Sequence, residues 1–446
     1  MMNFSKTERK LFTIVGALTI VGLTACAGAL PTQTAPLAAP TTHTSITLRF
    51  WHTKSGIAAT TLSALADDFH KAYPNITVRA EQKASEGDLL REGLGAMALN
   101  QTPDFIIASK RTIAEFARKG ALVNLDVLAG EVEQGLSETD RNDFLPGLLD
   151  AGRLPDLKNQ WYAFPFDKNA VVLYYNADLL QAAKADVPPR TWDQFGNAAR
   201  VTTKGNVHGW VMSPSAATFA AIQFSRGSSV LNATQTQAQF GDDAGLKSLQ
   251  LIVALKNGDA AYLAPSADAA RSDFAQAKTA LLFGTTDDLT AIADSVAHAG
   301  NFKWGVANIP QINPAQAATT VLGSDLAIFR PVGNASEKQV QAAWLFARWL
   351  VLPEQSARWT RATLSIPVRV SAQSLLASNL PPNFQRLSDG WSNGLPTLKA
   401  MPAVKDANLI DTAIVEMWIN IANGYDPATA LKNATTRVNR VLGQIP

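Results

Sequence analysis

The chain has 446 residues but a single cysteine, Cys26, and only five histidines. One thiol cannot form a disulfide within the chain, so the fold must depend on its packed core. The His and Cys residues show no spacing typical of a zinc site, and no dense run of carboxylates resembles a calcium loop. The sequence therefore predicts no metal ion and no cofactor.

Charge is also scarce, since Asp, Glu, Lys and Arg make up 17% of the residues and the formal net charge is +2. No basic run is longer than two residues, whereas a nucleic-acid-binding protein concentrates Lys and Arg on one face. We therefore expect no nucleic-acid partner. The hydrophobic content of 47% is that of a well-packed globular protein, and a body of about 400 residues is too long for one core but right for two lobes.

The N-terminus contains one apolar run, at residues 11–23, which is too short to span a bilayer comfortably. Basic residues precede this run and Leu23-Thr24-Ala25-Cys26 follows it, an order typical of a secretory signal. A cysteine directly after small residues resembles the bacterial lipobox, in which the thiol is acylated. We expect residues 1–25 to be a lipoprotein signal peptide and Cys26 to be lipidated. An ordinary signal peptide with an incidental cysteine, or a short membrane anchor, is the alternative.

Residues 26–45 are rich in Pro, Thr and Ala and show no hydrophobic period. Such a composition buries too little surface to offset the entropy of ordering, so we interpret it as a flexible tether. The expected location is extracytoplasmic, with a globular body anchored to the bacterial cell membrane by lipid. That location favours capture, sensing or extracellular hydrolysis.

The body opens with strand and helix patterns in alternation. "SITLRFWHTKSG" alternates apolar and polar residues as a strand does, and "TLSALADDFHKAYPN" has helical spacing. "NITVRA", "DLLREGLGAMALNQ", "PDFIIAS" and "TIAEFARKGAL" continue the series. This order predicts a parallel α/β sheet. The segment Gly93-Leu94-Gly95-Ala96-Met97-Ala98 matches a loose dinucleotide fingerprint, but it follows helical residues instead of a strand, so we interpret it as helix.

Further segments complete a family resemblance. "ADDFHKAYPNITV", "PDFIIAS…AEFARKGALVNL", "AFPFDKNAVVLYYNADLL…PPRTWDQF", "FAQAKTALLFG", "AAWLFARWLVLPEQSARW" and "DPATALKNATTRVNRVL" occur in order after the tether. Together they resemble the carbohydrate-binding family of extracellular solute-binding proteins of ABC importers, which includes maltose-binding protein. The resemblance implies two α/β lobes that close on a carbohydrate ligand in the cleft between them, ABC permease subunits as partners, and a monomer.

The resemblance also implies where the chain passes between the lobes. Crossings are expected near residues 166–169, 323–325 and 366–369. Lobe 1 would comprise residues 46–166 and 323–368, and lobe 2 would comprise residues 167–322 and 369–446.

Sugars offer hydroxyls and a weakly apolar ring face, so a site needs polar side chains and flat aromatic rings on loops that follow strands. Thirteen residues occupy positions where the family pattern places the cleft or the crossings. These are Trp51, His52, Lys54, Ser109, Arg111, Asp167, Asn169, Trp210, Thr285, Thr286, Ser324, Asp325 and Arg369.

Structural roles remain open for several of these residues. Trp51 is equally suited to cover the edge of the sheet, and His52 to be an exposed loop residue. Asp167 and Arg369 are equally suited to form an ion pair at the hinge, and Asp325 to cap the segment after it. Lys54, Arg111 and Arg369 would suit an anionic ligand if they converge.

Two departures from maltose-binding protein bear on the ligand. Ala108 and Thr286 stand where that protein has aromatic residues, which disfavours maltodextrin and favours a different glycan. Whether the ligand is instead a phosphorylated polyol, as the resemblance also allows, is left open by the sequence. Two other functions compete with import. An extracellular enzyme acting on polysaccharide would need paired carboxylates or an activated nucleophile, and the sequence contains no G-x-S-x-G or H-E-x-x-H motif. A ligand sensor that docks on a receptor would have the same sequence features as an importer's binding protein.

Overall fold

The computed structural model describes Leu37 and residues 45–300, 302–332, 337–376, 385–387 and 394–443. The chain divides into two units, Met1–Pro36 and Leu37–Pro446, and the fold described below is that of the second unit. The predicted signal peptide, Cys26 and almost all of the predicted tether lie outside the described residues.

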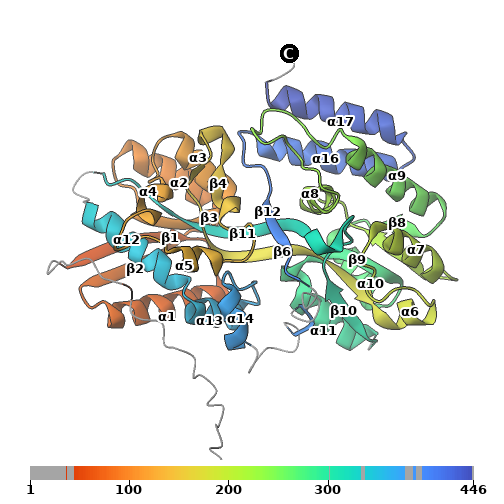
Figure 1. Cartoon of the computed structure of the whole chain (residues 1–446), viewed down its shortest axis with the longest axis horizontal. Helices are drawn as coiled ribbons and strands as arrows, with labels where there is room; N and C mark the ends of the chain where they lie inside the picture. Colours follow the sequence, from red (N-terminus) through yellow and green to blue (C-terminus); the bar gives the residue numbers. More distant parts are fainter. Residues whose placement is uncertain are drawn as a thin grey trace, which may run out of the picture. The chain divides into compact units, whose positions relative to one another are not determined.

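Strands and helices alternate along the described chain (Figure 1). The first third contains β1 (Ile46–His52), α1 (Gly56–Ala72), β2 (Ile76–Gln82), α2 (Glu86–Ala98), β3 (Phe105–Ser109), α3 (Lys110–Arg118), α4 (Leu125–Ala129), α5 (Glu138–Asn142), β4 (Arg153–Leu154) and β5 (Gln160–Trp161). The middle contains β6 (Phe164–Asn176), α6 (Ala177–Ala182), α7 (Trp192–Thr202), β7 (His208–Met212), α8 (Ala216–Ser225), α9 (Asp243–Asn257), β8 (Ala261–Leu263), α10 (Ala267–Ala275), β9 (Thr279–Thr285), α11 (Leu289–Ala299) and β10 (Trp304–Ala307). The rest contains β11 (Ala318–Ile328), α12 (Glu337–Leu350), α13 (Pro353–Thr363), α14 (Val370–Leu376), β12 (Thr397–Ala400), α16 (Ala407–Ala422) and α17 (Pro427–Val441).

The first three strands form a parallel sheet, as the sequence predicts. β1 pairs in parallel with β2 on one side and with β3 on the other. Helix α1 buries Leu62, Leu65 and Phe69, which are spaced as one face of a helix requires. We call this sheet and the helices packed on it lobe 1; helices α12 and α13 also belong to it, because α13 packs on α1 and α12 on β1.

A second parallel group, β7 with β8 and β9, forms the core of what we call lobe 2. Helix α9 contacts both α7 and α8 there, and α16 and α17 pack on α9. The strand order of the whole sheet is β2-β1-β3-β11-β6-β9-β7-β8, with β10 beside β6 and β12 beside β11. The predicted two-lobe α/β fold is confirmed.

The two strands at the centre of this order, β6 and β11, are antiparallel to each other. β6 begins beside β11 in lobe 1 and ends between β9 and β10 in lobe 2. β11 runs the opposite way, from β12 to β3. We call β6 and β11 the crossing strands. The sheet is therefore mixed instead of wholly parallel, because the chain must pass out to lobe 2 and return.

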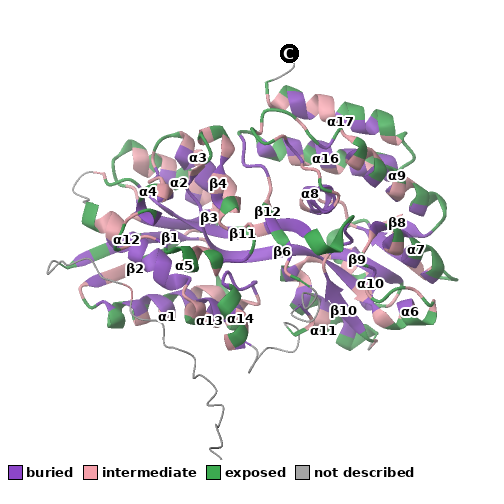
Figure 2. Cartoon of the chain, viewed as in Figure 1, coloured by how far each residue is buried: buried purple, intermediate pink, exposed green. Residues whose placement is uncertain are grey.

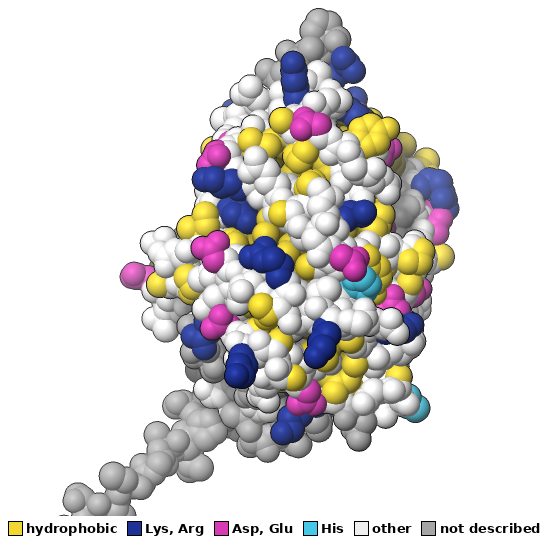
Figure 3. All heavy atoms as spheres, turned by 90° about the vertical axis from the view of Figure 1, so that its right-hand side faces the viewer, with side chains coloured by type: hydrophobic (Ala, Val, Ile, Leu, Met, Phe, Trp, Pro, Cys, Tyr) yellow, Lys and Arg dark blue, Asp and Glu magenta, His cyan; other side chains and the backbone are white. Residues whose placement is uncertain are grey.

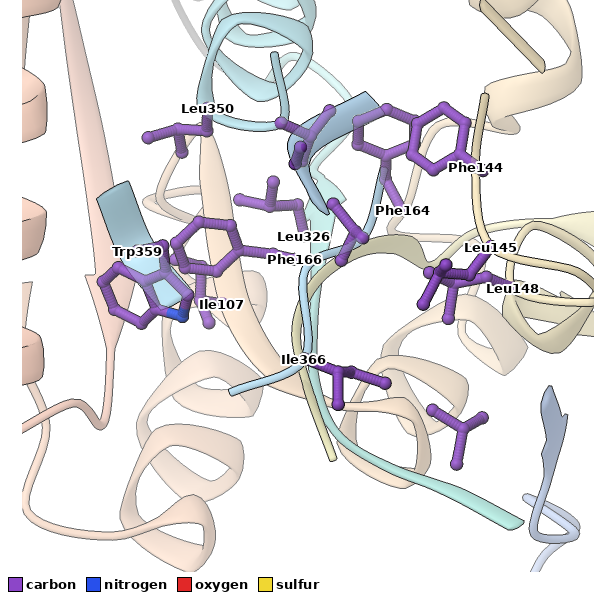
Figure 4. Close-up of a cluster of buried hydrophobic side chains, with 14 of the residues drawn as sticks. Ile107, Phe144, Leu145, Leu148, Phe164, Phe166, Leu326, Leu350, Trp359 and Ile366 are labelled. Atoms are coloured by element: carbon purple, nitrogen blue, oxygen red, sulfur yellow. The ribbon is translucent and has the colours of Figure 1, made fainter. Parts of the chain in front are cut away.

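Apolar side chains anchor the lobe 1 end of the crossing strands (Figure 4). Phe164 of β6 lies 5.0 Å from Trp344 between ring centroids, and Phe166 lies 4.6 Å from Trp359. Ile366 lies in the same cluster and donates its backbone N–H to Lys168. Figure 2 shows buried residues along the strands and exposed residues on the outer faces of the helices. The start of β6 is thus fixed by lobe 1.

Local sequence signals for helices agree with the structure. Thr191 and Gln194 form the predicted capping box of α7, and Asp426 caps α17 with Pro427 in its first turn. The segment from Gly93 to Ala98 lies within α2, which confirms its interpretation as helix. Gly93 packs directly against the ring of Phe116 of α3, so a small residue is needed at this helix contact.

The surface reflects the low net charge. On the face shown in Figure 3, Lys and Arg side chains are interspersed with Asp and Glu. Among the described residues, no helix combines the length and the apolar character that crossing a membrane requires.

Candidate functional site

A pocket of about 530 Å³ lies above the crossing strands, between α3 of lobe 1 and helices α8 and α16 of lobe 2. We call it the interlobe pocket. Its lining comes from both lobes and from both crossing strands. The lining residues are Ser109, Lys110, Arg111, Ala151, Lys168, Pro214, Ser215, Ala216, Ala217, Val321, Leu322, Gly323, Asp325, Ala400, Met401, Asp411 and Val415.

The N-terminus of α3 forms the lobe 1 side of the pocket. Ser109 ends β3 and caps α3, because its Oγ accepts a hydrogen bond from the backbone of Thr112. The carboxylate of Glu86 accepts hydrogen bonds from the backbone N–H of Ser109, at 3.2 Å, and from Thr112 Oγ1, at 2.7 Å. This turn therefore holds Lys110 and Arg111, the first two residues of α3, at the pocket.

The N-terminus of α8 forms part of the lobe 2 side. Ser215 caps this helix by accepting a hydrogen bond from the backbone of Thr218 at 3.0 Å. Residues 214–217 line the pocket, and Pro214 lies just after the end of β7. Two helix N-termini, one from each lobe, thus line the same pocket.

A two-point ion pair joins the lobes across the pocket. Arg111 of α3 donates to Asp411 of α16 through Nη1 to Oδ2 at 2.6 Å and through Nη2 to Oδ1 at 2.9 Å. Arg111 Nε also donates to the backbone oxygen of Pro402. Because α16 packs on α8 and α9, this contact links lobe 1 directly to lobe 2.

The base of the pocket contains a buried ion pair between the crossing strands. Lys168 Nζ of β6 lies 2.6 Å from Asp325 Oδ1 of β11. Burial raises the pKa of Asp325, although the charges of Lys168 and Lys110 oppose the rise. Within the described residues no hydrogen bond or ion pair engages the ammonium group of Lys110, and burial lowers its pKa to about 8.

The other face of the crossing strands carries a second polar group. Lys54 Nζ lies 2.5 Å from Asp167 Oδ2 of β6 and 2.9 Å from Ser324 Oγ of β11. The carboxylate of Asp167 also accepts hydrogen bonds from Trp359 Nε1, at 3.1 Å, and from Ser365 Oγ. We call these five residues the crossing cluster. Burial opposes ionisation of Asp167, but the Lys54 charge and the three hydrogen bonds together hold its pKa below the usual value.

The thirteen predicted site residues therefore lie in different places. Ser109, Arg111 and Asp325 line the interlobe pocket. Lys54, Asp167 and Ser324 belong to the crossing cluster on the opposite face.

Four others lie near that cluster. His52 is buried, and its Nδ1 accepts a hydrogen bond from the backbone of Lys54 at 3.1 Å. Thr286 Oγ1 donates to Asn169 Oδ1 at 3.2 Å. Thr285 accepts a hydrogen bond from Tyr174 through its backbone oxygen.

Three predicted residues lie apart from both groups. Trp51 is buried beneath Lys83, whose ammonium lies 3.8 Å from the ring centroid. Trp210 packs in the core of lobe 2 against Phe195. Arg369 is 2% exposed and donates to the backbone oxygens of Val351 and Asp140.

The hinge ion pair between Asp167 and Arg369, left open by the sequence, is not formed. Asp167 pairs with Lys54 instead, and Arg369 lies 3.7 Å from the carboxylates of Asp140 and Asp143.

The structure adds charged residues that the sequence analysis missed. Lys110 lies between the selected Ser109 and Arg111, and Lys168 lies between Asp167 and Asn169. Alternation of side chains along a strand was the signal for Lys168, because its neighbours must face the other way. Asp411 lies on a C-terminal helix, and its position against Arg111 depends on tertiary packing alone.

The chain is similar to known proteins in both sequence and fold. Residues 54–357 match the family described as bacterial extracellular solute-binding protein. The sn-glycerol-3-phosphate-binding periplasmic protein UgpB of Salmonella typhimurium is 23% identical over 423 residues, which are 89% of this chain and 92% of that protein.

Solved structures show the same fold. The cyclic alpha-maltosyl-1,6-maltose binding protein of Arthrobacter globiformis is 20% identical with a TM-score of 0.74, covering 89% of this chain and 99% of that one. UgpB of Mycobacterium tuberculosis, solved in complex with glycerophosphocholine, is 20% identical with a TM-score of 0.68, covering 89% and 98%. The match to the family covers more than half of the chain. The chain therefore belongs to the bacterial extracellular solute-binding proteins, which bind a solute instead of transforming it.

Proposed function

We propose that this protein captures a small sugar or polyol derivative in the interlobe pocket and delivers it to the permease of an ABC importer. The observation that carries the proposal is the pocket itself, of about 530 Å³ and lined by both lobes. This volume is in the usual range for small-molecule sites, about 300–1,000 Å³. Hydroxyl, ammonium, guanidinium and carboxylate groups in the lining suit a ligand with many hydroxyls.

The connection between the lobes supports a closing motion. The crossing strands and the segment around Ile366 join the lobes, and hinge closure about such connections is a standard mode of domain motion. We propose lobe 1 as residues 46–166 and 323–368 and lobe 2 as residues 167–322 and 369–446. The packing of α14 on α13 favours moving the last boundary to the end of α14.

A thermal-shift screen tests capture. The purified protein is heated with monosaccharides, oligosaccharides, polyols and glycerol phosphates, one at a time. A solute that binds only the folded state adds about 2.7 kcal/mol to the free energy of unfolding at 100 times its Kd. We expect one chemical class to raise Tm in proportion to the logarithm of its concentration, and the solute to be recovered unchanged. Cleavage products, or no shift with any solute, would contradict the proposal.

We further propose that Cys26 is lipidated and anchors a monomer to the outer side of the cytoplasmic membrane through residues 26–45. The order of basic, apolar and small residues before Cys26 supports this anchor. Cys26→Ala is expected to move the protein from the membrane fraction to the soluble or secreted fraction, because the acylated thiol is lost. Fractionation followed by mass spectrometry of the N-terminal peptide measures both location and acylation. An unacylated Cys26 in a membrane-bound wild type would instead indicate a peptide anchor.

A further inference from the structure

We propose that Arg111 and Arg118 of α3 form a latch with Asp411 and residues 401–404. The latch holds lobe 1 and lobe 2 together beside the interlobe pocket and slows the release of a captured solute. This inference rests on the proposed function and deepens it, since it concerns how the same pocket opens and closes.

Residues 401–404 are held by both lobes. They connect β12, which pairs with the lobe 2 end of β11, to α16. Ala403 is 2% exposed and belongs to the same buried apolar cluster as Ile113 of lobe 1. The next residue, Val404, belongs to the cluster that contains Trp418 of lobe 2. The segment therefore joins the lobes at a place other than the three crossings.

Two arginines on one side of α3 bind this segment. Arg111 Nε donates to the backbone oxygen of Pro402 at 3.3 Å, and Arg118 Nη2 donates to the backbone oxygen of Ala403. The two arginines are seven positions apart in the chain, which is about two helical turns, so they lie on the same face of the helix. Lobe 1 thus contacts successive peptide units of the segment.

Lobe 1 alone orients the guanidinium of Arg118. Its Nη1 lies 2.8 Å from Glu115 Oε1, and its Nε lies 2.8 Å from Asp156 Oδ2. A planar guanidinium presents its N–H groups in a fixed fork, so fixing two of its nitrogens also fixes Nη2, which bonds Ala403. Arg118 is not among the described residues that line the pocket, so we assign it as a positioning residue that acts through the segment.

The ion pair between Arg111 and Asp411 is suited to break and re-form. A bidentate pair of this kind fixes geometry as well as charge. The two side chains are 35% and 30% exposed, so water can solvate both groups when the lobes separate. The pair between Lys168 and Asp325, in contrast, is 6% and 4% exposed, and separating a buried pair is costly. Ala403 is a small residue, so its release exposes little apolar surface. Separation at α3 therefore costs less than separation of the crossing strands.

The latch forms part of the pocket wall. Arg111, Ala400, Met401 and Asp411 all line the interlobe pocket. Separation of α3 from these residues therefore opens the pocket on that side. A contact that exists only in the closed arrangement raises the closed population, and with it the apparent affinity for a solute that the closed arrangement binds. Loss of the latch should then speed dissociation while leaving association nearly unchanged.

Pulsed electron paramagnetic resonance on the purified full-length protein tests the latch without any solute. Spin labels are attached at Arg91→Cys on α2 and Lys432→Cys on α17, two exposed positions. Cys26→Ala removes the single native thiol, so no third label is attached. We expect one main distance between the labels in the protein with an intact latch. Arg118→Met and Asp411→Asn should each add a population with a different interlobe distance, because each removes one contact of the latch.

Arg153→Met is the matched control. Its side chain is 26% exposed, against 19% for Arg118, and it also binds a carboxylate and a backbone oxygen, those of Asp126 and Asn159. Both partners belong to lobe 1, so this variant should keep the original distance. Arg118→Lys keeps a charged donor and should restore most of the original distribution. If Arg118→Met fails to fold, Asp411→Asn at its more exposed position provides the test.

Stopped-flow fluorescence measures the consequence for solute release. The probe is the solute that raises Tm most in the thermal-shift screen. Arg118→Met is expected to raise its dissociation rate about tenfold, the usual effect of losing one hydrogen bond from a charged group. The association rate should change little. Because Arg118 lies outside the described pocket lining, such a change would not come from a lost contact with the solute.

The outcomes separate the latch from the proposed function. If Arg118→Met and Asp411→Asn keep the original distance, or if Arg153→Met changes it as much, the latch is wrong and solute capture is unaffected. If the distance changes as expected but no solute in the screen binds, the contact between the lobes stands and solute capture is wrong. A changed distance with an unchanged dissociation rate would show that the contact does not control release, which also overturns the inference.

Discussion

Replacing Asp167 with alanine is expected to lower the free energy of unfolding by about 3–5 kcal/mol, the usual cost of removing one partner from a buried ion pair. The side chains of Asp167 and Lys54 are only 12% and 14% exposed, so the change leaves the Lys54 ammonium poorly solvated with Ser324 as its remaining partner. Trp359 and Ser365 also lose their acceptor. Urea unfolding measures the loss.

The pH dependence of this contribution follows from the pKa of Asp167. Its folded-state pKa is held below the usual value of 3.8, so the stabilisation is fully present above that value and is lost as the pH falls through the folded pKa. The difference between wild type and Asp167→Ala should therefore be constant at neutral pH and shrink in acid. A difference that grows in acid would contradict this assignment.

An exposed ion pair provides the matched control. Lys247 lies 2.6 Å from Asp243 on α9, with side chains 59% and 74% exposed. Exposed ion pairs contribute about 0–1 kcal/mol, so Lys247→Ala should change the free energy of unfolding by no more than about 1 kcal/mol. Lys54→Ala, in contrast, should lower the free energy of unfolding nearly as much as Asp167→Ala does. Equal effects of Lys54→Ala and Lys247→Ala would show that the crossing cluster does not stabilise the fold.

Much of the fold could be predicted from the sequence because its signals are local. The alternation in "SITLRFWH", the helical spacing of Leu62, Leu65 and Phe69, and the capping box at Thr191 each depend on residues close together in the chain. Short-range periodicity and capping report directly on backbone conformation. The antiparallel direction of the crossing strands was harder to predict, since it is decided by pairing between residues more than 150 positions apart.

The candidate site was less predictable, for a geometric reason. The sequence pointed to residues at crossings and strand ends, but it could not say which face of β6 each side chain occupies. Asp167 and Lys168 are adjacent in sequence, yet one joins the crossing cluster and the other the pocket. A strand that is polar on both faces gives no hydrophobic pattern to fix the assignment.

The role of Trp210 could not be predicted from the sequence either. The sequence predicts Trp210 as a ligand-binding residue, but its side chain is 2% exposed and packs against Phe195 and Phe283. A large aromatic ring is as suitable for a core as for a ligand site. Only the tertiary packing of lobe 2 distinguishes the two uses.

Gly323→Ala is expected to destabilise the fold by about 2–6 kcal/mol, because backbone strain and steric overlap each cost about 1–3 kcal/mol. Gly323 lies in β11 at the pocket with φ of +101°, a region that other residues rarely adopt. A Cβ at this position would overlap the backbone oxygen of Asp167 and lie 3.2 Å from Lys168 Cα. Both atoms belong to the backbone of β6, so neither can move without separating the crossing strands. Chemical unfolding and calorimetric titration measure stability and binding in parallel.

Gly120→Ala is the control that separates the cost of backbone strain from the cost of steric overlap. Gly120 follows α3 with φ of +70°, but a Cβ there would meet no atom within 4 Å, so only the conformational cost of about 1–2 kcal/mol applies. If Gly323→Ala and Gly120→Ala lowered the free energy of unfolding by similar amounts, the crossing strands β6 and β11 would be free to separate around the added Cβ. If they cannot, Gly323→Ala should also weaken the Lys54–Asp167 pair, because the added Cβ pushes on the residue that makes it. The losses in free energy of unfolding caused by Gly323→Ala alone and by Asp167→Ala alone should then add up to more than the loss in the double variant. Neighbouring substitutions that disrupt one shared contact are not additive.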